Sequence, residues 1–310
     1  RGLRLSLLGF AWFIGVAWLV ILCLSLVAKA IATGDAVGKL TGIFNLYLGV
    51  GIILGSVFTA YLNRGRVELG TVAVGALGMS AALLLAGVFV PTKPMDSHTA
   101  FNACLMLMGF SGAIFSVPLR GFMVDRAGEE RRGRVLASST LLSNLFALAF
   151  IGLHFLLLRT FELSAQGQFL FMALPSLIVT GYVLYLLPEA IFRTLVLILT
   201  RTFYNVRIQN AENIPVSGGA LLIANHISYA DPAMIGAACP RHVRFIGFSG
   251  LAESRFIRFI FKLSGVIPVS PTNAREAITK AAEHIAQGEV VCIFPEGSIS
   301  RTGAMHGLKR

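Results

Sequence analysis

Residues 220–231 read Ala-Leu-Leu-Ile-Ala-Asn-His-Ile-Ser-Tyr-Ala-Asp, and residues 290–297 read Val-Val-Cys-Ile-Phe-Pro-Glu-Gly. Each stretch begins with a short apolar run and ends in polar or turn-forming residues, a pattern typical of a buried strand followed by a loop. Asp231-Pro232 then predicts the start of a helix, because Pro is well tolerated in a first helical turn. The last third of the chain is therefore expected to be an α/β domain, with its ligands at the carboxyl ends of the strands.

His226 and Asp231 are a candidate general base and its orienting carboxylate. Neutral imidazole, with a pKa of about 6.5, can remove a proton from a hydroxyl group near neutral pH. A carboxylate bonded to the other ring nitrogen selects the tautomer and stabilises the imidazolium. The spacing allows Asp231 to fold back beneath His226 across one tight turn. Each residue alone also has an ordinary structural explanation, since Asp before Pro is a common helix N-cap.

The turn after the second apolar run is a candidate phosphate-binding element. Backbone N–H groups at such a turn can face an anion at the end of a strand. For Phe-Pro-Glu-Gly taken alone, a plain β-turn is the alternative. In this order, however, His-x4-Asp and Phe-Pro-Glu-Gly resemble the motifs of the glycerophosphate/lysophosphatidate acyltransferase family.

This resemblance implies an acyltransferase that moves an acyl group from a thioester to a glycerol hydroxyl. His226 would be the base and Asp231 its orienter. No bound cofactor and no metal ligand are implied, and acyl-ACP or acyl-CoA would be the donor substrate. The implied substrate-binding residues are Asn225, Ser270, Glu296, Gly297, Ser298 and Arg301.

Two departures from the family pattern bear on the acceptor. Ser270 and Ile299 stand where the family usually carries arginines, and Arg301 lies two positions after the second of these. A phosphomonoester normally recruits guanidinium groups. Their loss favours a lysophosphatidylethanolamine-like acceptor. A biosynthetic lysophosphatidate acyltransferase with a membrane anchor is the alternative.

The strings Val-Ile-Pro-Val-Ser-Pro-Thr at 266–272 and Gln-Gly-Glu-Val-Val-Cys-Ile-Phe-Pro-Glu-Gly at 287–297 add a second resemblance. Both are similar to the acyltransferase part of bacterial 2-acylglycerophosphoethanolamine acyltransferase/acyl-ACP synthetases. That similarity implies acyl carrier protein as a partner and a C-terminal acyl-activating domain. The domain at 189–310 is accordingly expected to be incomplete at its C-terminus.

The composition indicates a membrane protein. Charged residues make up 13% of the chain and hydrophobic residues 55%, whereas a soluble domain has about 25% charged residues. The net charge of +11 fits cytoplasmic loops and an anionic lipid surface better than nucleic acid. The four cysteines show no paired spacing, so neither a zinc site nor a disulfide framework is expected.

Six apolar stretches each approach the ~20 residues that a helix needs to cross a bilayer, at 7–29, 40–62, 69–90, 100–123, 136–158 and 168–187. Basic residues concentrate at both flanks and after the second and fourth stretches, at 1, 4, 64, 66, 120, 126, 131, 132, 134 and 193. The opposite loops carry basic residues only at 29, 39, 93 and 159. The positive-inside rule then places both ends and everything after 188 in the cytoplasm.

The segments 55–68 and 108–123 resemble those of major facilitator lysophospholipid transporters. The resemblance implies that 1–188 is an all-α, six-helix, C-terminal transporter half in a bacterial inner membrane, whose N-terminal half is missing. Lysophospholipid would be taken up and then reacylated; a facilitator for another solute is the alternative. Polar residues inside spans are costly in lipid, so they are candidate cavity residues, although interhelical hydrogen bonds explain each equally well: Asn45, Asn102 and Asn144.

Two further segments are candidate membrane contacts. Residues 190–204 are apolar but interrupted by Arg193 and Arg201, which suits a helix in the headgroup layer; a buried core helix is the alternative. Residues 255–262, Arg-Phe-Ile-Arg-Phe-Ile-Phe-Lys, alternate bulky apolar residues with cations that can meet lipid phosphates. Membrane lipid is therefore an expected partner of the α/β domain as well.

Overall fold

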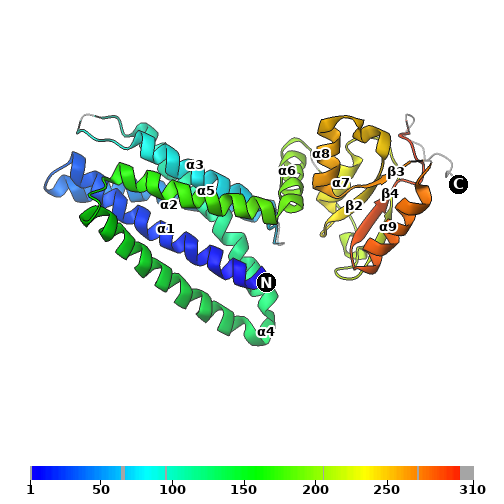
Figure 1. Cartoon of the computed structure of the whole chain (residues 1–310), viewed down its shortest axis with the longest axis horizontal. Helices are drawn as coiled ribbons and strands as arrows, with labels where there is room; N and C mark the ends of the chain where they lie inside the picture. The colour runs from blue at the N-terminus through cyan, green and yellow to red at the C-terminus, as the bar shows by residue number, and fades with distance from the viewer. Residues whose placement is uncertain (1, 64–66, 95, 205, 271, 301–310) are drawn as a thin grey trace. The chain divides into compact units, whose positions relative to one another are not determined.

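The computed structural model describes residues 2–63, 67–94, 96–204, 206–270 and 272–300. The chain divides into two compact units, Arg1–Leu187 and Pro188–Arg310. The first is built of α1 (Gly2–Ile31), α2 (Asp35–Asn63), α3 (Gly70–Phe89), α4 (Thr99–Arg159) and α5 (Ala165–Leu186) (Figure 1). Within the described residues, these five helices are long and apolar enough to cross a membrane.

Helix α4 contains two of the predicted spans, which corrects the expectation of a loop between them. It runs for 61 residues, and its helical geometry is broken at Gly128 (φ 66°, ψ 167°). A straight helix of that length would extend about 90 Å, roughly three times the hydrocarbon thickness of a bilayer. Figure 1 shows α4 changing direction sharply. The charged stretch expected as a loop is helical apart from Gly128, because its Glu and Arg residues are good helix formers and only glycine readily takes a positive φ.

Small residues allow α2 and α4 to approach closely. A Cβ added at Gly51 would collide with the backbone carbonyl of Met106, and one added at Gly55 would collide with that of Phe110. In contrast, nothing lies within 4 Å of a Cβ built at Gly49. Packing of small residues between helices therefore accounts for part of the glycine stripe on α2.

The second unit is an α/β layer structure. Its helices are α6 (Pro188–Phe203), α7 (Asp231–Ala238), α8 (Arg255–Ser264) and α9 (Ala274–Ala286), with short 3-10 turns η1 (Ala211–Asn213) and η2 (Ser249–Glu253). The strands are β1 (Ala220–Ile223), β2 (Val243–Phe248), β3 (Ile267–Val269) and β4 (Val290–Ile293). They form one sheet in the order β1-β4-β2-β3, and all pairs are parallel.

Strand β4 lies inside the sheet and is buried on both faces. Val290 and Cys292 pack in one apolar cluster with Cys239 of the α7 end, whereas Val291 packs on the other face with Ala277 of α9. Ile223 of β1 is in register with Ile293 of β4. The segments that follow these two strands, 70 residues apart in the sequence, therefore leave the sheet side by side.

Arg193 fastens α6 to the rest of the second unit. Its guanidinium donates hydrogen bonds of 3.0 Å to the backbone carbonyls of Gly236, Cys239 and Arg241. These carbonyls lie in the last turn of α7 and just beyond it, where a helix leaves acceptors unsatisfied. Arg193, which the sequence predicted to interrupt an interfacial helix, therefore joins α6 to the end of α7. We call these three hydrogen bonds the Arg193 clamp.

Candidate active site

His226 and Asp231 meet at the carboxyl end of β1. The Nδ1 atom of His226 lies 2.9 Å from Oδ2 of Asp231. The same carboxylate oxygen accepts hydrogen bonds from the backbone N–H groups of Ile227 (2.7 Å) and Ser228 (2.8 Å). Asp231 is the first residue of α7, whose N-cap is Ala230 and makes no side-chain cap bond. The carboxylate therefore holds the loop and the imidazole rather than acting as an ordinary N-cap.

Asp231 is held as a carboxylate. Burial by itself would raise its pKa, but the hydrogen bonds from His226 and from the N–H groups of Ser228 and Ile227 outweigh burial and lower the pKa below its usual value. An ionised Asp231 accepts a hydrogen bond from the Nδ1–H group of His226, which leaves Nε2 of His226 as the basic nitrogen. The pair has the geometry that a general base requires.

Two residues of Phe-Pro-Glu-Gly, and Ser300 shortly after it, contact His226. Phe294 stacks on the imidazole, with ring centroids 4.2 Å apart and planes 19° apart. The carboxylate of Glu296 accepts the backbone N–H of His226 at 3.2 Å, and the N–H of Ser300 donates to the His226 carbonyl at 2.7 Å. The supporting roles of Phe294 and Ser300 were missed in the sequence, where only the proximity of the two motifs to strand ends was a signal.

The bond from Ser300 ties residues 298–300 back to the end of β1. Glu296 is 1% exposed, although the sequence predicted that it contacts the acceptor. Its place beneath the His226 loop favours a positioning role. The two motifs therefore form one hydrogen-bonded unit.

Three other predicted substrate-binding residues lie along the same edge of the sheet. Asn225, Gly297 and Ser298 are exposed at the ends of β1 and β4. Gly297 has a φ of 64°, and its N–H closes the turn on the Phe294 carbonyl at 3.1 Å. Glycine suits this position because other residues rarely adopt a positive φ. Arg301 lies outside the described residues.

Ser270 follows β3, which β4 and β2 separate from β1. About three strand spacings, roughly 14 Å, therefore lie between the backbones of Ser270 and His226. The Ser270 hydroxyl contacts Oδ1 of Asn273 at 2.8 Å and Oγ1 of Thr272 at 2.9 Å. Ser270 is on the predicted edge but not beside the His226–Asp231 pair.

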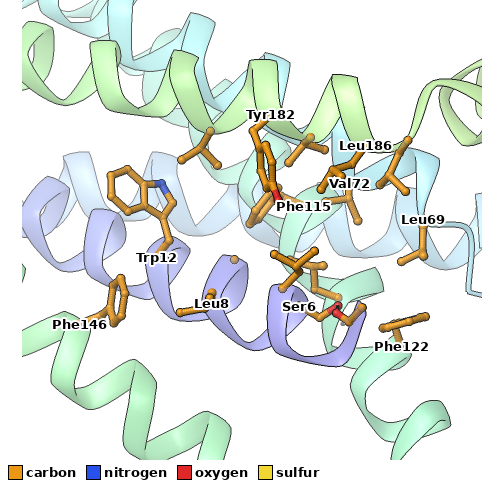
Figure 2. A pocket seen from close by; sticks show the side chains of 17 residues that line it. Ser6, Leu8, Trp12, Leu69, Val72, Phe115, Phe122, Phe146, Tyr182 and Leu186 are labelled. Carbon is orange, nitrogen blue, oxygen red and sulfur yellow. Dashed lines mark hydrogen bonds between the residues drawn. The ribbon is translucent and has the colours of Figure 1, made fainter.

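The first unit contains an apolar cavity of about 360 Å³ (Figure 2). Trp12 of α1, Phe115 and Phe146 of α4 and Tyr182 of α5 are among the side chains that line it. The indole N–H of Trp12 is buried and has no hydrogen-bond partner among the described residues. The lining suits a hydrocarbon chain better than a polar solute.

The three predicted transport residues do not line this cavity. The side-chain amide of Asn45 donates to the Thr41 carbonyl of its own helix at 2.9 Å. The side-chain oxygen of Asn102 is buried without a hydrogen-bond partner in the described part of the chain, and Asn144 is exposed. Their part in transport stays a prediction.

Comparisons with known proteins agree with the chemistry of the second unit. Residues 205–310 match the family described as Acyltransferase. Over 112 residues, 35% of this chain and 31% of the relative, the chain is 27% identical to a chloroplastic 1-acyl-sn-glycerol-3-phosphate acyltransferase of Arabidopsis thaliana. It is 29% identical over 108 residues to the 1-acyl-sn-glycerol-3-phosphate acyltransferase of Borreliella burgdorferi, covering 33% of this chain and 42% of the relative.

The enzyme of the same name from Bacillus subtilis is 27% identical over 107 residues, which are 34% of this chain and 53% of that relative. The chain thus spans about a third to a half of the length of these curated relatives. No solved structure matches the chain significantly. Residues 205–310, which include His226 and Asp231, therefore match an acyltransferase domain.

Proposed function

We propose that the second unit transfers an acyl group from a thioester to the free glycerol hydroxyl of a lysophospholipid. The observation that carries this proposal is the 2.9 Å contact between His226 and Asp231 at the end of β1. Nε2 of His226 removes the hydroxyl proton while the oxygen attacks the thioester carbonyl. The tetrahedral intermediate then breaks its carbon–sulfur bond, and the leaving thiolate takes the proton from the imidazolium. The products are a diacyl phospholipid and a free thiol of acyl carrier protein or coenzyme A.

A lysophosphatidylethanolamine-like acceptor fits the proposal best, because Ser270 and Ile299 are uncharged where a phosphomonoester site normally offers guanidinium groups. One observation favours a second candidate acceptor. The curated relatives are named 1-acyl-sn-glycerol-3-phosphate acyltransferases, so lysophosphatidate is the alternative.

Initial rates with the two acceptors and one acyl donor separate these candidates. The expected result is several-fold faster acylation of lysophosphatidylethanolamine. Faster acylation of lysophosphatidate would identify lysophosphatidate, rather than lysophosphatidylethanolamine, as the acceptor. A matched test introduces arginine as Ser270→Arg, which should improve the relative rate with lysophosphatidate if this edge of the sheet faces the acceptor phosphate.

We further propose that the first unit moves lysophospholipid inward across a bacterial inner membrane and that the acyltransferase domain faces the cytoplasm. Five apolar helices, the apolar cavity and the distribution of basic residues support this proposal. Cysteines introduced at 131 in intact cells should resist an impermeant thiol reagent added from outside, whereas cysteines introduced at 93 should react. The reverse pattern would overturn the orientation.

The transport step is tested separately from acylation. In vesicles that contain the chain together with any transporter half that precedes it, fluorescent lysophosphatidylethanolamine should cross the membrane even when His226 is replaced by alanine. Transport of an unrelated solute and not of this lipid would support a facilitator of another kind.

A further inference from the structure

The outward face of α8 carries two large apolar side chains between three cations. Phe256 is 69% exposed and Phe259 is 61% exposed. Arg255, Arg258 and Lys262 are exposed on the same helix, which contains no acidic residue. Residues three and four apart share a face of a helix, so the five side chains form one surface. We call it the α8 face.

The opposite side of α8 is fixed to the second unit, so the α8 face points away from the core. Phe261 approaches Gly247 of β2, where a Cβ would lie 3.1 Å from the phenyl ring. On the α8 face itself, Nε of Arg258 donates to the Ala252 carbonyl of η2 at 3.0 Å, which also holds the helix on the second unit. Gly265, with a φ of 65°, ends the helix in the left-handed conformation. The exposure of the two phenylalanines is therefore not caused by a loose helix.

Exposed apolar residues continue onto the neighbouring elements. Phe248, the last residue of β2, and Leu251 of η2 are exposed as well. These elements follow the carboxyl end of β2, which pairs with β4, so they lie at the edge of the sheet that carries His226. Contiguous exposed apolar surface in a protein marks a site of interaction.

The chain itself supplies a reason for lipid to be near. Helix α6 packs against α8, and α6 begins two residues after the end of α5. Helix α5 is long and apolar enough to span a membrane. The covalent chain therefore keeps α8 close to any bilayer that contains α5.

We propose that the α8 face docks onto an anionic phospholipid bilayer. The rings of Phe256 and Phe259 enter the boundary between headgroups and acyl chains, and Arg255 and Lys262 bind lipid phosphates, as in interfacial amphipathic helices. Aromatic and cationic side chains side by side suit this boundary because it is apolar on one side and negatively charged on the other. Docking would hold the edge of the sheet at the depth from which a lipid acceptor emerges, whichever headgroup the acceptor bears.

The test places a fluorophore on the α8 face of the full chain reconstituted in vesicles. Phe259→Cys is labelled with an environment-sensitive dye, and Ile278→Cys on α9 is the matched control because Ile278 is 64% exposed. The native cysteines of the described chain are buried, so labelling is selective. The vesicles contain phosphatidylcholine, with or without phosphatidylglycerol, and a quencher attached to the lipid acyl chains.

We expect quenching at 259 to exceed quenching at 278 about threefold or more in vesicles with phosphatidylglycerol. Arg255→Gln combined with Lys262→Gln should reduce it, as should omission of phosphatidylglycerol. Equal quenching at 259 and 278 overturns the proposal. A dye at 259 that is shielded from water but not quenched by lipid also overturns it, because a protein surface then covers the helix.

The result does not depend on catalysis. Quenching should be unchanged when His226→Ala is added, so a failure of the proposed acyl transfer and a failure of membrane docking remain distinguishable.

Discussion

The carboxylate of Glu296 accepts the backbone N–H of His226 at 3.2 Å, across the adjoining ends of β4 and β1. The contact places Glu296, which the sequence associates with the acceptor, under the loop that contains His226 instead. Two roles for Glu296 are therefore in competition, and kinetics can separate them.

We expect Glu296→Ala to lower kcat by about 10-fold to 100-fold with little change in KM for the lysophospholipid, because the base loses a positioning contact. Glu296→Gln keeps an acceptor oxygen in the same place and should retain most of the activity. Steady-state rates over a range of acceptor concentrations give both constants. A large rise in KM with kcat unchanged would return Glu296 to the acceptor site.

Replacement of His226, the proposed base, should have the largest effect on acyl transfer. His226→Ala should lower the rate of acyl transfer by about 10²-fold to 10⁴-fold, the usual contribution of a general base. Asp231→Asn should also reduce it strongly, because the amide cannot stabilise the imidazolium as a carboxylate does. Acyl transfer is measured in the membrane-embedded chain. Near-normal turnover by a correctly folded His226→Ala protein would contradict the mechanism.

Acid should weaken the second unit through His242. Burial lowers the pKa of His242, and the charges of Arg244 and Arg193 act in the same direction, whereas Glu189 and Glu289 oppose them. Because the pKa is lower in the folded state than its unfolded value of about 6.5, the neutral imidazole stabilises the fold fully above that value. This contribution is lost as the pH falls through the folded pKa.

Buried thiols report on the prediction for His242. Burial raises the pKa of Cys292 to about 12, with a further contribution from Cys239, so both thiols should resist alkylation until the unit opens. The extent of Cys292 alkylation, measured by mass spectrometry, reports how far the second unit opens. Acidification should destabilise the His242→Gln protein less than the unaltered protein. The same loss in both proteins would assign the effect to other groups.

The packing of α2 against α4 predicts different effects on stability for two glycine substitutions in α2. Gly55→Ala should destabilise the first unit by about 1–3 kcal/mol, because its Cβ meets the Phe110 backbone and backbone cannot move cheaply. Gly49→Ala, with nothing within 4 Å, should be neutral or stabilise the helix by up to about 1 kcal/mol. Thermal unfolding in detergent, followed by the fluorescence of Trp12 and Trp18, compares the two. Equal behaviour of the variants would contradict this packing.

Local patterns in the sequence predict the strands more securely than their order. The apolar runs that become β1 and β4 are short and bounded by turn residues, so they can be recognised directly. That these strands are neighbours depends on the crossovers of the whole sheet. The bond between Glu296 and His226 follows from that order, which is why the sequence could associate the two motifs without assigning this contact.

The bend in α4 could not be predicted from the sequence for a different reason. Charged residues between two apolar stretches predict a loop in a membrane protein, but Glu and Arg also favour helix. Only the backbone angles at Gly128 separate the two limbs. The burial of Glu296 was equally hidden, because a charged residue next to a strand end is exposed in most proteins.

The clamp that Arg193 forms on the end of α7 bears on where the gene can be divided. A shortened protein that begins after residue 203 would remove the donor to three carbonyl oxygens and uncover the side of α7 that α6 covers. A cut between 187 and 188 keeps the clamp together with its acceptors. A shortened protein for expression therefore begins with α6 at Pro188, and detergent or lipid will be needed to cover the exposed apolar side chains of that helix.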